Sequence, residues 1–108
     1  MNEFKEKVLL RIFTGETDKI DGKPVFEMIV DMAKSKGLAG VTVLKGIMGF
    51  GAHKIIHSSK LLDLSTDLPM VIEVVDEEEV IEDFLMDIRT VLKSGTATTE
   101  KIRVINFG

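Results

Sequence analysis

Hydrophobic and polar residues alternate along four short stretches of the chain, and each alternation predicts a β-strand. In the first stretch, Val8, Leu10 and Ile12 share one face. In the last stretch, Ile102 and Val104 are expected to face the core. The four predicted strands cover residues 7–13, 40–47, 70–75 and 101–105.

Two further stretches repeat their apolar residues at helical spacing. The first helix is predicted for residues 24–36 and is closed by Gly37, because glycine suits the position just past a helix C-terminus. The second helix takes Asp76 as its N-cap and ends at Gly95. Thr96 to Glu100 is then predicted to be a polar turn before the last strand.

The order strand, helix, strand, strand, helix, strand is the split βαβ arrangement. We therefore expect a single α+β domain over residues 1–108, with a ferredoxin-like βαββαβ fold. Such a fold has one four-stranded antiparallel sheet with two helices on one face. The other face would leave apolar side chains in water, which predicts an oligomer. The residues expected there are Leu9, Phe13, Thr42 and Leu44, with Ile72 as a further candidate.

Composition narrows the function classes. The 108 residues carry a net charge of −4, which argues against sequence-independent nucleic-acid binding. The chain has no cysteine, so disulfides and thiolate chemistry are excluded. No apolar run is long enough to span a bilayer, and the start of the chain does not resemble a signal peptide. We therefore expect a cytoplasmic protein that does not insert into a membrane.

Catalytic groups are not evident from spacing. The sequence shows neither a Ser–His–Asp arrangement nor two carboxylates placed across a cleft, so we expect no enzyme activity. Glu73 is the one carboxylate in the middle of an apolar strand. We expect it to point out of the sheet, or to pair with Arg11 or Arg103 across an interface. Arg11 itself is expected to be a solvated or interface charge.

A glycine-rich stretch follows the second predicted strand. Gly46, Gly49 and Gly51 lie between Lys45 and Lys54. Glycine lets a ligand approach the backbone, and exposed N–H groups beside cations suit an anion. The alternative is an ordinary hairpin tip, and spacing alone does not decide between the two.

The connection from Gly49 to Pro69 is long and holds several apolar residues. Either part of it forms an extended ribbon, or it packs on another subunit. His53 and His57 lie in it at an i, i+4 spacing, which on a helix could hold a metal ion. Their surroundings do not predict a helix, so contact of one histidine with phosphate or base is the stronger alternative, beside a plain loop role.

At the level of whole motifs, the sequence resembles the PII signalling proteins, and still more the small PII-like proteins of bacteria and archaea. The resemblance covers nearly the whole chain. Its stretches run from Gly37 through Gly51 to His57, from Asp67 to Asp76, and from Ser94 to Val104, and the Gly22-Lys23-Pro24 start of the first helix adds to them. It implies a homotrimer that binds adenine nucleotides in clefts between subunits and transmits the bound state through the long loop.

The resemblance also implies site residues. Gly49-Phe50-Gly51 matches the base of the family's signalling loop, Thr42 a strand position in the same cleft, and Lys101 a phosphate-binding lysine. Arg103 shares a strand face with Lys101 and is added on spacing alone. The predicted nucleotide-binding residues are Thr42, Lys45, Gly46, Gly49, Phe50, Gly51, His53, Lys101 and Arg103.

Two departures from the family limit the comparison. The chain has no tyrosine, so regulation by tyrosine modification and the usual nitrogen-pathway partners do not carry over. The two basic residues that PII proteins place beyond the last strand have no counterpart before Gly108, which weakens the expected binding of ATP and favours ADP or AMP as the ligand. Lys45, His53 and Lys54 are candidates for the missing charge.

The sequence thus predicts a regulator with no obligatory cofactor, whose loop 46–68 controls an unidentified partner protein. The alternatives are a divalent-metal-binding trimer of the same fold, which would use His53 and His57, and a structural adaptor that binds no ligand.

Overall fold

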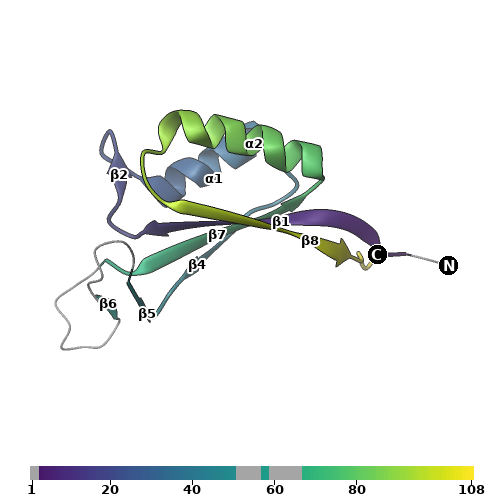
Figure 1. The fold of residues 1–108 in the computed structure, drawn as a ribbon, viewed down its shortest axis with the longest axis horizontal. Helices are drawn as coiled ribbons and strands as arrows, with labels where there is room; N and C mark the ends of the chain where they lie inside the picture. Colours follow the sequence, from purple (N-terminus) through teal and green to yellow (C-terminus); the bar gives the residue numbers. More distant parts are fainter. Residues whose placement is uncertain (1–2, 51–56, 59–66) are drawn as a thin grey trace.

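The computed structural model describes residues 3–50, 57–58 and 67–108. Its main sheet consists of β1 (Lys5–Gly15), β4 (Thr42–Lys45), β7 (Pro69–Asp76) and β8 (Thr96–Val104), and its helices are α1 (Val25–Ser35) and α2 (Glu78–Val91). The four strands are antiparallel in the order β4-β7-β1-β8. Both helices lie on one face of the sheet (Figure 1). This confirms the predicted ferredoxin-like βαββαβ fold.

The core lies between the sheet and the helices, and the alternation along β1 and β7 supplies it. Leu10 and Ile12 are buried opposite Val74 and Ile72 of β7, because directly opposed residues share a face. The prediction that Ile72 lies on the open face is therefore wrong, and its neighbour Val71 lies there instead. The largest fully buried side chains are Phe84, Leu10, Ile12, Ile29, Ile72, Ile81 and Val74.

Strand β8 differs from the sequence prediction in length and in orientation. It begins at Thr96, so the predicted turn over residues 96–100 is the first half of a strand. Lys101 lies opposite the core residue Val8, whereas Ile102 lies opposite Lys7. Ile102, and Val104 with it, therefore point to the open face, and the prediction that they face the core is wrong.

The ends of the helices follow local chemistry. Gly37 follows α1 with a φ of +79°, and the N–H groups of Gly37 and Leu38 bond back to Lys34 and Ala33, as in a Schellman cap. Asp76 does not cap α2, contrary to the prediction. It ends β7, and its carboxylate accepts hydrogen bonds from the backbone N–H groups of Ala39 and Glu77.

The second helix also ends earlier than predicted. It stops at Val91, with Leu92 in an extended conformation, because the chain turns toward β8 before it reaches Gly95. None of the helices in the described ranges is both long and apolar enough to cross a membrane.

Two small hairpins complete the described part of the chain. One pairs β2 (Lys19–Ile20) with β3 (Lys23–Pro24) around the turn predicted at Asp21-Gly22. The other pairs β5 (Met48–Gly49) with β6 (His57–Ser58). The sequence predicted that part of the long connection forms an extended ribbon or that the connection packs on another subunit. The pairing of β5 with β6 shows that an extended ribbon is present there.

Candidate functional site

The glycines after β4 pack against a proline. Gly46 donates its N–H to the carbonyl oxygen of Pro69 at 2.7 Å. A Cβ added at Gly46 would stand 2.6 Å from Cγ of Pro69, and one at Gly49 would stand 3.0 Å from the same atom. The sequence predicted that a ligand approaches these glycines closely. In the structure, Pro69 on the other side of the loop makes that close approach at both glycines.

A turn at the end of β1 joins this region. Glu16 donates its backbone N–H to the carbonyl of Leu68 at 2.8 Å, and Thr17 donates to the Asp67 carboxylate at 3.0 Å. The Glu16 carboxylate forms an ion pair with Lys45, with 2.5 Å between Oε2 and Nζ. The two sides of the loop, at Lys45 and at 67–69, are therefore both bound to the same turn.

Sequence reasoning missed Glu16 and Asp67. Glu16 lies 29 positions before Lys45, and the Asp67–Thr17 hydrogen bond joins residues 50 positions apart, so no local spacing reveals either contact. The one signal available was Asp67-Leu68-Pro69, which stands directly before an apolar strand.

The other predicted cations lie on β8. Lys101 is exposed, and its Nζ is 3.9 Å from Oε1 of Glu6. Arg103 places its guanidinium over the ring of Phe4, at 4.2 Å from the ring centre. Both side chains leave β8 on the face that carries the helices, as their opposition to Val8 and Glu6 shows. That they share one strand face is as predicted.

The two groups of predicted residues lie far apart within one chain. Strands β4 and β8 are the opposite edges of the sheet. Lys45 is aligned through Met70 with Thr14 of β1, whereas Lys101 is aligned with Val8. Those two rows are separated by about 20 Å along the strands, and the two edges by about 14 Å across them. One chain therefore does not bring Lys45 and Lys101 together.

Thr42 lies beside a charged cluster on the open face of the sheet. It is directly opposite Glu73, which in turn is opposite Arg11. Arg11 donates to Glu73 and to Glu100, both at 2.8 Å. The pairing predicted for Glu73 with Arg11 is therefore present, within one chain. These two hydrogen bonds, first that to Glu73, raise the pKa of Arg11 above its ordinary value.

Apolar side chains surround this cluster and continue toward the loop. Phe13 and Leu44 are 39% and 49% exposed, although both belong to strands of the main sheet. Phe50 is 63% exposed. The predicted residues Gly51 and His53 lie outside the described residues, and His57 is described only through the backbone pairing of β6 with Gly49.

Metal ligands do not gather in the part of the chain that the structure covers. Among residues 3–50, 57–58 and 67–108, no group of three histidine, cysteine or acidic side chains is arranged to hold an ion. The proposed pair His53 and His57 is not tested by this, because His53 is not described.

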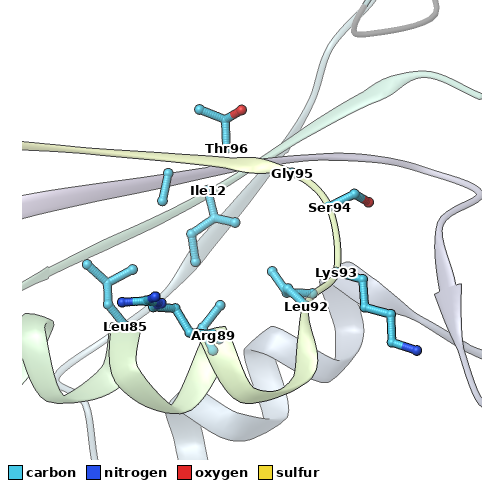
Figure 2. A pocket seen from close by; sticks show the side chains of 10 residues that line it. Ile12, Leu85, Arg89, Leu92, Lys93, Ser94, Gly95 and Thr96 are labelled. Atoms are coloured by element: carbon cyan, nitrogen blue, oxygen red, sulfur yellow. The ribbon is translucent and has the colours of Figure 1, made fainter.

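Two shallow grooves run between α2 and β8. The first, of about 320 Å³, is lined mainly by apolar side chains of α2, β1 and β8, together with Arg89 and Lys93. In Figure 2, Leu92 points inward toward Ile12, whereas Lys93 points away from the groove. The second, of about 210 Å³, includes Lys101. Lys101 is the only predicted site residue on either groove within the described ranges.

Comparisons with known proteins agree on one family and one fold. Residues 7–104 match the DUF190 family, described as "Uncharacterized ACR, COG1993". A UPF0166 protein of Aquifex aeolicus is 43% identical over 100 residues, which are 93% of this chain and 94% of that protein. A UPF0166 protein of Methanocaldococcus jannaschii is 36% identical over 87 residues, covering 81% and 80%.

Solved structures similar to this chain include PII-like proteins. CPII of Thiomonas intermedia K12, bound to ADP and bicarbonate, superposes with a TM-score of 0.67 at 20% identity, covering 95% of this chain and 92% of CPII. A candidate PII-like signaling protein of Thermus thermophilus gives a TM-score of 0.70 at 17% identity, covering 96% and 94%. At these identities the similarity establishes the fold, which is the PII-like fold that the sequence resemblance implied.

Proposed function

Because the chain belongs to the DUF190 family and has a PII-like fold, we propose that it is an adenine-nucleotide-sensing regulator rather than an enzyme. The ligand class is taken from CPII, which binds ADP. In this proposal, ADP, AMP or ATP is a ligand and not an obligatory cofactor. Its phosphates contact Lys101 and Arg103 of one chain and the Thr42–Phe50 region of another.

The observation that carries the proposal is the placement of these residues on the two edges of one sheet. Strand β8 presents Lys101, and β4 leads into Lys45 and Gly46, at opposite edges and opposite ends. A single chain cannot close a site around one phosphate group with both. A second copy that brings its β4 edge to the β8 edge of the first would unite them.

The open face of the sheet supports assembly. Phe13 and Leu44 remain partly exposed there, and the half-buried Leu9, Val71 and Ile102 share their face. Burying apolar area contributes roughly 25 cal/mol per Å², so contact between such faces is favourable. We propose a trimer, as the resemblance to PII proteins implies.

Nucleotide binding would act on a partner through the loop 46–68. Both sides of this loop are joined at Glu16 and Pro69, next to the proposed phosphate position. A ligand that contacts this junction more favourably in one loop conformation than in another shifts the loop population toward that conformation.

Thermal unfolding with and without nucleotide tests the proposal. A ligand that binds only the folded state at 100 times its Kd stabilises it by about 2.7 kcal/mol. We expect millimolar ADP to raise the melting temperature, and Lys101→Ala to abolish that rise. Lys19→Ala, which removes an exposed lysine from the β2–β3 hairpin, is the matched control and should keep it.

The proposal fails if no adenine nucleotide at millimolar concentration changes the melting temperature of the unaltered chain. Native mass spectrometry of the purified protein supplies the second test. We expect three copies per particle with retained nucleotide, and a monomer would contradict the composite site.

A further inference from the structure

The structure places Lys45, a predicted phosphate ligand, in an ion pair with Glu16. The distance between Lys45 Nζ and Glu16 Oε2 is 2.5 Å. The Glu16 side chain is 26% exposed and that of Lys45 is 51% exposed, so the carboxylate is the more buried member of the pair. A carboxylate and a phosphate oxygen are both anionic acceptors, and each competes for the same ammonium group.

The backbone holds Glu16 in this position. Its N–H bonds to the carbonyl of Leu68, and the next residue, Thr17, bonds to the carboxylate of Asp67. The turn that carries Glu16 is thus tied to the returning side of the loop, whereas Lys45 stands at the end of β4 on the departing side. Their ion pair bridges the two sides.

The surroundings of the pair are acidic. Asp18 accepts the N–H of Gly15 at 2.9 Å, and a Cβ added at Gly15 would stand 2.8 Å from the Asp67 carboxylate and 3.2 Å from that of Asp18. The carboxylates of Asp18 and Asp67 therefore both lie close to Gly15, the residue before Glu16, while Lys45 pairs with Glu16. A phosphate that approached Lys45 in place would meet the Glu16 carboxylate on the same ammonium group.

We propose that Glu16 is an internal competitor for the phosphate, so that nucleotide binding must first separate Lys45 from Glu16. This inference rests on the proposed function, because it takes Lys45 as a phosphate ligand. The flexible four-carbon stem of lysine lets the ammonium group turn from one acceptor to the other. Glu16 thereby lowers the affinity for phosphate and couples its binding to contact between the two sides of the loop.

Isothermal titration of the full chain with ADP tests the inference. Glu16→Gln keeps the size of the side chain and removes its charge. Glu27→Gln, at an exposed position in the first turn of α1, makes the same charge change outside the Glu16–Lys45 ion pair and is the control. Since exposed ion pairs contribute modestly, we expect Glu16→Gln to bind ADP about two- to fivefold more tightly than Glu27→Gln.

Adenosine separates competition for phosphate from a merely structural effect. Because it lacks phosphate, its affinity should be equal in the two variants. In a Lys45→Met background, Glu16→Gln should give less than its usual gain for ADP. The gain should also shrink at high salt, because salt screens charges near the surface. Equal affinity of the Glu16→Gln and Glu27→Gln variants for ADP would overturn the inference, as would an equal gain for adenosine.

Inorganic tripolyphosphate distinguishes failure of the inference from failure of the proposed function. If the unaltered chain binds no adenine nucleotide, the proposed function fails. Tighter tripolyphosphate binding by Glu16→Gln than by Glu27→Gln would then still support competition at Lys45. Equal binding, or none in either variant, would overturn it.

Discussion

Replacing Gly46 by alanine should destabilise the fold, because the position of the new methyl group is already occupied. The Cβ would stand 2.6 Å from Cγ of Pro69 and 3.2 Å from its carbonyl oxygen. A proline ring cannot rotate away as a lysine side chain can, and the carbonyl belongs to a strand of the sheet. Relief therefore requires the backbone of β4 and β7 to move apart, which strains the hydrogen bond from Gly46 to Pro69.

The size of the effect follows from the crowding. Overpacking by one methyl group in a well-packed place costs about 1–3 kcal/mol. For a domain of about 100 residues, each kcal/mol lowers the melting temperature by roughly 4–8 °C. We expect a fall of about 5–20 °C for Gly46→Ala and a smaller fall for Gly49→Ala, where the contact with Pro69 Cγ would be 3.0 Å.

Circular dichroism melts at one fixed protein concentration would measure this, since the midpoint of an assembling protein depends on concentration. Gly40→Ala is the matched control, because nothing lies within 4 Å of its added Cβ. A Gly46→Ala, Pro69→Ala double variant should recover stability relative to the sum of the two single changes. If Gly46→Ala and Gly40→Ala have the same melting temperature, or if the double variant recovers no stability, the packing argument is wrong.

Three further predictions concern the fold. Phe84→Ala should cost about 3–5 kcal/mol in urea unfolding, whereas Met86→Ala on the exposed side of α2 should stay within about 0.5 kcal/mol of the unaltered chain. Gly37→Ala should cost about 1 kcal/mol in the same assay, because the residue has a φ of +79° with open space around it. Hydrogen bonding to Asp87 raises the pKa of Lys36, so the stability that Lys36 contributes is complete below its ordinary pKa of 10.5 and is lost as the pH rises through the raised pKa. Lys36→Met should flatten the alkaline part of the stability profile, and an unchanged profile would contradict this.

The local sequence pattern was sufficient to predict the strands and helices that pack one face against the core. Along β1 and β7, apolar side chains alternate with half-buried ones, and the two helices repeat at their own period, so type and order were predictable. The edge strand β8 was not. Its core-side residues include Ala97, Thr99 and Lys101, because α2 does not cover this edge, and Ile102 belongs to the other face. On such a strand, hydrophobicity alone does not identify the face that meets the core of the chain.

The residues predicted to bind a nucleotide stay a prediction; what the structure shows is that Lys45 ends β4 and that Lys101 lies within β8. The packing of the glycines could not be predicted, because the atom that approaches Gly46 belongs to Pro69, 23 positions later. Contacts between residues so far apart in the sequence form only when the sheet has assembled, and they leave no local pattern in the sequence. The same holds for the ion pair of Glu16 with Lys45, which joins residues 29 positions apart.

These contacts change how the glycine-rich stretch would act. The N–H of Gly46 already donates to Pro69, so at this position the backbone is committed to the fold and the charge for an anion must come from side chains. Lys45 and Lys101 are two of the predicted cations, and each has a carboxylate near it, at 2.5 Å and 3.9 Å. The closer pair is the harder to exchange. If phosphate binds at both, contact with Lys101 should come at little cost, and contact with Lys45 should be the step that separates the two sides of the loop.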